Sequence, residues 1–180
     1  CASPAYAQLV WQKASRLADA IDAYKVAAVI RPDSPAVHLN MGVAFEQLGQ
    51  LEEARTAFGR ASSLLPDRDD LRLQMAWIAE RQQQGSQAEE LYSTLVDRNP
   101  NAESAWFRLG YLRLERGDAE GAAAAFRQCV EKRADWPEAQ INLSIAYSKL
   151  SQYTAAESAL QQLLVNHPNH PDALQGLAEI

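Results

Sequence analysis

Prolines recur along this chain at a fixed interval, and this interval constrains the fold more than any other feature of the sequence. Pro32, Pro66 and Pro100 are 34 residues apart, and Pro168 lies a further two intervals along. Ala134 occupies the place between them where the same spacing would put another proline. Because proline ends or interrupts a helix, the regular spacing predicts a series of helical units of equal length.

Three further columns of side chains keep the same spacing. The first contains only alanine, the second holds bulky side chains four residues later, and the third holds small residues. The members are Ala20, Ala54, Ala88, Ala122 and Ala156, then Tyr24, Phe58, Tyr92, Phe126 and Leu160, then Gly42, Ala76, Gly110, Ser144 and Ala178. Residues four apart lie on one helix face, so the small side chains let a second helix approach while the bulky ones fill the adjacent space.

Composition favours helices over strands. Of the 180 residues, 47% are hydrophobic and 22% are charged, which is typical of a globular protein. The chain has 32 alanines and 21 leucines but three threonines, and the Val, Ile and aromatic residues never alternate with polar ones over a strand-length window. We therefore predict an all-α protein.

The repeat columns resemble those of the tetratricopeptide repeat family, which has an aromatic residue, Leu-Gly and Tyr in its first helix and Ala, Phe and Pro in its second. The unit 103–136 matches this pattern at Trp106, Leu109, Gly110, Ala122 and Phe126. Arg113 replaces the expected tyrosine there, and His38 replaces the tryptophan in the unit 35–68. The predicted repeats are 1–34, 35–68, 69–102, 103–136 and 137–170, with a partial sixth at 171–180.

The resemblance implies a right-handed α-solenoid of antiparallel helix pairs, built as a single stack over residues 1–180. Each pair has too little core to be stable alone and must pack on its neighbours. In this family the first helices line a concave groove that holds a peptide or a partner helix. The resemblance therefore implies a protein partner.

Repeat positions 5 and 9, counted from the first residue of each unit, face the groove in this family and are apolar in this chain. The pairs are Leu39 with Val43, Leu73 with Trp77, Phe107 with Tyr111, and Ile141 with Ile145. An apolar stripe at this spacing is often buried core, and packing within a tightly wound superhelix is the alternative here. Because exposed apolar patches mark interaction sites, we expect a binding surface anchored by Trp77, Phe107 and Tyr111.

Polar side chains complete the expected groove. Position 6 holds Asn40, Gln74, Arg108 and Asn142, and position 13 holds Arg81 and Lys149 in two of the units. The amides resemble the asparagine ladder of some family members, in which each amide contacts the backbone of a bound peptide. Ordinary solvated side chains are the alternative.

Several other functions are not expected. Seventeen basic against 23 acidic residues leave a net charge of −6, whereas nucleic-acid binding needs a basic surface. The sequence contains no apolar run long enough for a transmembrane helix, no glycine-rich phosphate loop and no nucleophile elbow. His167 and His170 lack further ligands for a metal site. We therefore expect no catalysis, no metal and no cofactor.

The start of the sequence suggests export from a bacterial cell in two alternative ways. Cys1 resembles the lipidated first residue of a mature lipoprotein, which would provide a lipid anchor. Alternatively, Ala5-Tyr6-Ala7 resembles a signal-peptidase cleavage site. A cytoplasmic protein whose sequence begins at an arbitrary fragment boundary is the other interpretation.

The sequence as a whole predicts a non-enzymatic scaffold that binds a partner peptide or helix in an apolar and aromatic concave groove. The alternative is a spacer or regulatory repeat region of a larger enzyme or of a secretion or envelope assembly. The sequence does not identify the partner, because similar solenoids bind unrelated ligands.

Overall fold

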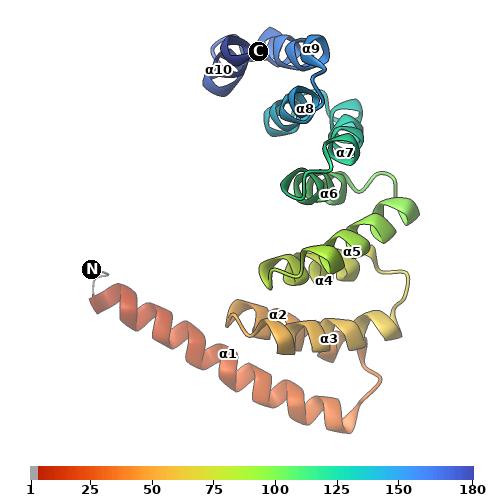
Figure 1. Ribbon diagram of the computed structural model, residues 1–180. Coiled ribbons are helices and arrows are strands. Elements are labelled where there is room, and N and C mark those ends of the chain that lie inside the picture. Colours follow the sequence, from red (N-terminus) through yellow and green to blue (C-terminus); the bar gives the residue numbers. More distant parts are fainter. Residues whose placement is uncertain (1–3) are drawn as a thin grey trace. The chain divides into compact units, whose positions relative to one another are not determined.

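The computed structural model describes the backbone of residues 4–180 and the side chains of residues 12–180, and this range contains ten helices and no strand (Figure 1). The prediction of an all-α solenoid is confirmed. Cys1, and with it the predicted lipid anchor, lies outside the described residues, as do the side chains of residues 5–7. The helices are α1 (Pro4–Ile30), α2 (Pro35–Gln47), α3 (Leu51–Leu64), α4 (Asp69–Arg81), α5 (Gly85–Arg98), α6 (Glu103–Glu115), α7 (Ala119–Lys132), α8 (Pro137–Lys149), α9 (Tyr153–Asn166) and α10 (Pro171–Glu179).

From α2 onward the helices repeat with the 34-residue step of the prolines. The even-numbered helices start at positions 35, 69, 103, 137 and 171, and the odd-numbered ones at 51, 85, 119 and 153. A residue with left-handed backbone reverses the chain within each pair: Gly49 and Gly117, with φ of 75° and 83°, and Gln83 and Ser151, with φ of 60° and 58°. Glycine suits this conformation, so the two non-glycine turns carry some backbone strain.

The first repeat differs from the expected helix pair. Residues 4–30 form one continuous helix, α1, without the turn that divides the later units. In the later units the residue at repeat position 15 has left-handed backbone and turns the chain. The corresponding residue here is Ser15, which lies inside α1.

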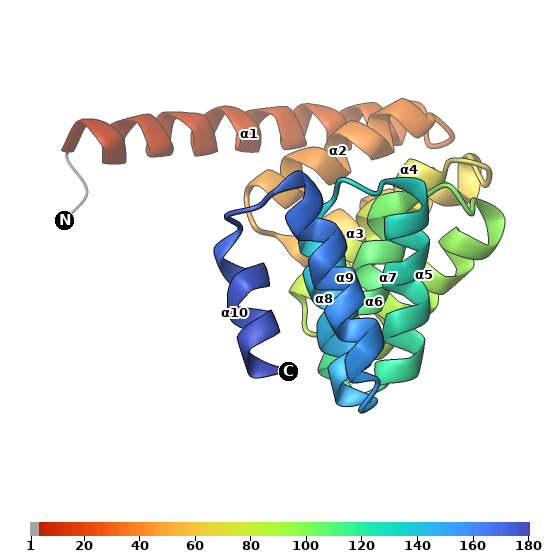
Figure 2. The same ribbon diagram turned by 90° about the horizontal axis from the view of Figure 1, so that it is seen from above.

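The chain divides into two compact units, residues 1–88 and 89–180, with the boundary inside α5. In the first unit α1 packs on α2, α2 on α3, and α3 on α4. In the second, α6 to α10 pack in chain order, and α8 also contacts both α6 and α10 (Figure 2). The even-numbered helices of the second unit are therefore direct neighbours. The continuation of one stack through both units stays a prediction.

Most side chains of the three small and bulky columns are buried in the core. Ala54, Ala122 and Ala156 are fully buried, as are the Phe58 and Phe126 rings. A Cβ atom at Gly42 would lie 2.8 Å from the Phe58 ring, and one at Gly110 would lie 2.9 Å from the Phe126 ring. Glycine at these two positions is what lets the helices of each pair approach so closely. No helix among the described residues is both long and apolar enough to cross a bilayer.

Candidate protein-binding face

Side chains at repeat position 4 anchor the start of three first helices. His38 Nε2 lies 2.7 Å from the Pro32 carbonyl oxygen, and Trp106 Nε1 donates to the Pro100 carbonyl oxygen at 3.0 Å. Arg72 donates to the Pro66 carbonyl oxygen in the same way. These three residue types share a side-chain N–H, which explains how histidine and arginine replace the tryptophan of the family pattern. Sequence reasoning missed this role, although the shared N–H was a visible signal.

The four side chains at repeat position 9 are apolar and exposed. Val43 and Trp77 belong to α2 and α4 in the first unit, and Tyr111 and Ile145 belong to α6 and α8 in the second. Each keeps between 37% and 40% of its surface accessible. Large apolar side chains that keep this much surface, one on each of four first helices, are available to a partner.

The position 5 side chains lie deeper. Leu39 packs against the core of the first unit, Ile141 packs against Leu160 and its neighbours, and Leu73 is half-buried. The Phe107 ring stacks on Trp136 at a centroid distance of 4.8 Å and meets the Phe126 ring edge-on at 5.7 Å. Position 5 therefore contributes more to packing than position 9 does.

An arginine side chain of the same helix lies next to each exposed aromatic ring at position 9. The Arg81 guanidinium lies 4.7 Å from the centroid of the Trp77 ring, and that of Arg108 lies 5.5 Å from the Tyr111 ring. These cation–π contacts put positive charge next to an apolar surface. A partner with an acidic group beside an apolar one would match either pair.

Glu46 adds an opposing charge in the first unit. Burial raises the pKa of its carboxyl group, while the positive charge of Arg81 acts to lower it. The influence of Arg81 on Glu46 indicates that the ends of α2 and α4 lie within electrostatic range of each other. This side of the first unit therefore combines Val43 and Trp77 with charges of both signs.

The predicted amide ladder is incomplete. Asn40 and Gln74 are exposed, but the Asn142 side-chain amide donates to the Glu138 carbonyl oxygen of its own helix at 2.7 Å. A partner backbone would have to compete with this local bond to use the Asn142 amide. The Asn40 and Gln74 amides could bind a partner backbone without first breaking a local hydrogen bond of this kind.

The C-terminal part of the predicted groove contains a hollow. A cavity of about 400 Å³ lies between α8 and α10 and includes Ile145, Lys149 and Glu179 in its lining. An adjoining smaller cavity adds Ile141 and shares Ile145 and Glu179 with the first. Three of the residues predicted from the sequence therefore line one depression within the second unit.

Cys129 is buried in the core, and His167 makes a side-chain hydrogen bond. Burial raises the pKa of the Cys129 thiol to about 12, so the thiol is protonated at neutral pH. His167 Nε2 lies 2.6 Å from a carboxylate oxygen of Asp135. Within the described part of the chain, no group of three or more His, Cys, Asp or Glu side chains is arranged to hold a metal ion.

Family models of the tetratricopeptide repeat match residues 13–49, 35–68, 73–139 and 113–180. An alignment of 180 residues, which covers 93% of this chain, is 28% identical to the general transcriptional corepressor ssn6 of Schizosaccharomyces pombe. A second alignment of 175 residues, which covers 91% of this chain, is 26% identical to the cellulose synthase operon protein C of Pseudomonas fluorescens. The chain spans 16% and 13% of the length of these two relatives.

Among solved structures, that of YrrB, described as a TPR protein with an unusual peptide-binding site, is similar to this chain with a TM-score of 0.75. The two sequences are 20% identical, and the match covers 94% of this chain and 87% of YrrB. At this identity the likeness extends to the fold alone.

Proposed function

The chain belongs to the tetratricopeptide repeat family, whose fold serves as a protein-interaction scaffold, and from this premise we propose that it binds a partner polypeptide through its first helices. The binding residues are Leu39, Asn40, Val43, Leu73, Gln74, Trp77 and Arg81 in the first unit, and Phe107, Arg108, Tyr111, Ile141, Asn142, Ile145 and Lys149 in the second. The supporting observation is the exposure of the four position 9 side chains. Burying such apolar side chains against a partner lowers the free energy of the complex, because it removes apolar surface from water.

Trp77 and Tyr111 are the proposed anchors. Aromatic side chains dominate the binding energy of interfaces when a partner desolvates them, and each of these two rings has an arginine guanidinium over it. Phe107 contributes less, because its contacts with Trp136 and Phe126 already use much of its ring.

The test uses peptides selected from a display library on the wild-type protein. The double variant Trp77→Ala, Tyr111→Ala should bind the selected peptides at least about 30-fold more weakly, with unchanged helical circular dichroism. Val29→Ala with Val165→Ala is the matched control, because these exposed valines lie on α1 and α9, outside the proposed face. Equal affinity of wild type and the aromatic double variant, or equal losses in both double variants, would contradict the proposal.

A second proposal is that the repeats form a spacer or regulatory region of a larger assembly. It is supported by the two curated relatives, which are much longer than the matched region. In that case the aromatic double variant would leave the function of the parent protein intact. Inserting or deleting one 34-residue repeat, which changes the distance between the ends, would impair it.

A further inference from the structure

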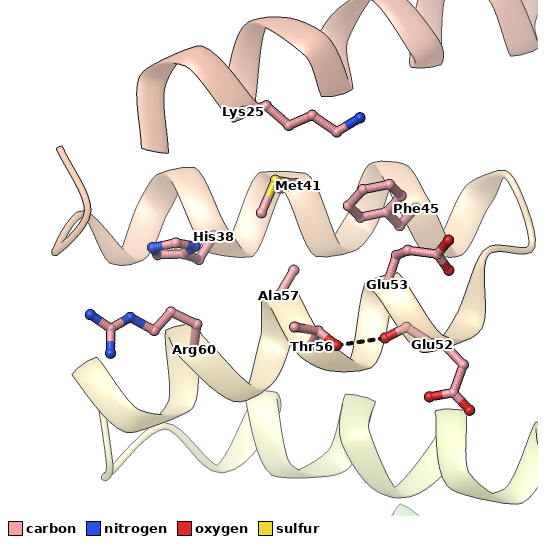
Figure 3. A pocket seen from close by; sticks show the side chains of 9 residues that line it. All are labelled: Lys25, His38, Met41, Phe45, Glu52, Glu53, Thr56, Ala57 and Arg60. Atoms are coloured by element: carbon pink, nitrogen blue, oxygen red, sulfur yellow. Dashed lines mark hydrogen bonds between the residues drawn. The ribbon is translucent and has the colours of Figure 1, made fainter. Parts of the chain in front are cut away.

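A cavity of about 580 Å³ lies in the first unit between α1, α2 and α3 (Figure 3). Met41, Phe45 and Ala57 form its apolar part. The remaining lining residues are His38, Thr56 and four charged residues, namely Lys25, Glu52, Glu53 and Arg60. A volume of this size accommodates a large side chain together with its neighbours in a bound segment.

The cavity and the proposed groove use opposite faces of α2. Successive residues of an α-helix are rotated by about 100°, which places Met41 and Phe45 on the side of the helix away from Leu39 and Val43. The cavity is therefore separate from the surface formed by the position 9 side chains. A ligand bound there would not require the groove.

His38 provides part of the reason for the cavity. At the same repeat position, α6 carries the larger indole of Trp106, and both side chains hydrogen-bond to the preceding proline carbonyl oxygen. The smaller imidazole ring fills less of the space next to Met41. His38 is only 8% exposed, and its Nδ1 atom is buried with no hydrogen-bond partner among the described residues. This leaves an unsatisfied polar atom on a residue of the cavity wall.

The charges around the cavity are unequally compensated. Lys25 pairs with Asp22 at 3.4 Å, and Arg60 pairs with Asp33 at 3.1 Å. Glu53 lies beside Phe45 at the other end (Figure 3), and its carboxylate forms no ion pair with a described residue. The uncompensated charge next to the apolar lining is therefore negative, and its electrostatic complement is a basic group.

We propose that this cavity is a second docking site, which binds a partner protein segment carrying an aromatic side chain next to a basic one. The aromatic ring packs against Met41, Phe45 and Ala57, and the basic group approaches the Glu53 carboxylate. The proposal goes beyond the groove, because the two sites lie on opposite faces of α2.

The chain contains two methionines, Met41 in the cavity and Met75 on α4, so methyl-labelled methionine gives one reporter and one internal reference. The probes are two capped tetrapeptides, acetyl-Gly-Trp-Arg-Gly-amide and acetyl-Gly-Trp-Glu-Gly-amide, titrated into the full chain. The arginine peptide should shift the Met41 signal in NMR spectra and leave the Met75 signal in place. The absence of a Met41 shift, or equal shifts at Met75, would overturn the proposal.

Charge variants test the basic group without disturbing the core. Glu53→Gln should weaken binding of the arginine peptide by about three-fold or more and remove its advantage over the glutamate peptide. Glu52→Gln is the matched control, because it removes the same charge from a carboxylate that points away from Phe45 in Figure 3. Equal effects of the two variants would overturn the role of Glu53.

His38→Trp tests the cavity itself by restoring the larger ring of the family pattern. This variant retains an N–H for the Pro32 carbonyl oxygen and should abolish the response of Met41 to the arginine peptide. A folded His38→Trp protein that still responds would overturn the proposal, and if the variant fails to fold, the glutamate variants decide the question. Trp77→Ala with Tyr111→Ala should leave this response intact, so loss of groove binding and loss of cavity binding are distinguishable.

Discussion

The α2–α3 pair of the first unit and the α6–α7 pair of the second have the same helix lengths and the same turn, but different side chains fill them. Both place a glycine against a buried phenylalanine ring, Gly42 on Phe58 and Gly110 on Phe126. At repeat position 11, however, α2 has the buried Phe45, whereas α6 has Arg113. The helix lengths, the turn and the contact between glycine and phenylalanine are therefore common to both pairs, whereas the side chain at position 11 varies.

Arg113 replaces apolar packing with a set of polar contacts. Its Nε atom lies 3.3 Å from a carboxylate oxygen of Glu89 and 4.0 Å from one of Asp118, and its Nη1 atom donates to the Gly121 carbonyl oxygen at 3.4 Å. Arg116 also pairs with Glu89. Phe45 has an apolar environment, next to Ile21, Ala57 and the neighbouring cavity. One repeat position therefore accepts an aromatic ring or a paired arginine.

The largest expected effect concerns the contact that the two pairs share. Phe58→Ala and Phe126→Ala should each reduce the free energy of unfolding by about 3 to 5 kcal/mol, because each removes a fully buried ring from a close helix contact. Urea denaturation with hydrogen exchange would assign each loss to its unit. A loss below about 1 kcal/mol in either variant would mean that this contact is not a requirement of the repeat.

A smaller and unequal effect is expected at position 11. Phe45→Ala should cost about 3 kcal/mol at any salt concentration, since its contacts are apolar. Arg113→Ala should cost about 1 to 2 kcal/mol, and less at high salt, because screening weakens the interaction with Glu89. Urea denaturation at low and high salt checks both values. The same salt dependence in both variants would remove the proposed distinction between the pairs.

The smallest effect is expected at position 12, where α2 has Glu46 and α6 has Leu114. Burial raises the pKa of Glu46 above its value of 4.5 in the unfolded chain, so the folded state holds the proton more tightly. The stability contributed by this group is present below pH 4.5 and is lost as the pH rises through the folded pKa. The stability of Glu46→Gln should therefore decline less than that of wild type between acidic and neutral pH. Thermal melts over this range would show it, and parallel curves would contradict it.

Much of the fold follows directly from the sequence. The spacing of Pro32, Pro66 and Pro100 and the alternation of small and bulky columns predict paired helices, because both depend on local backbone preferences and on residues sharing one helix face. The single helix α1 was not predicted. Ser15 stands at the repeat position where the later units turn, and Ser151 makes that turn at the same position, so the residue type does not distinguish the two outcomes.

The candidate site was predictable in part. Repeat spacing alone selected Val43, Trp77, Tyr111 and Ile145, which prove to be exposed. It did not show that Phe107 stacks on Trp136, because the two residues are brought together by the packing of separate helices. Nor did it reveal the cavity beside His38, because a cavity depends on how three helices fill a shared volume.

The repeat length, the helical class and the face of each first helix on which the apolar side chains lie all follow from the amino-acid sequence alone. Those properties depend on residues near each other along the chain. Three other properties became visible in the folded chain: α1 is undivided, the Arg81 and Arg108 side chains lie over Trp77 and Tyr111, and space remains next to Met41 and Phe45. Those outcomes depend on side-chain volumes and rotamers meeting in three dimensions, which a repeating pattern does not specify.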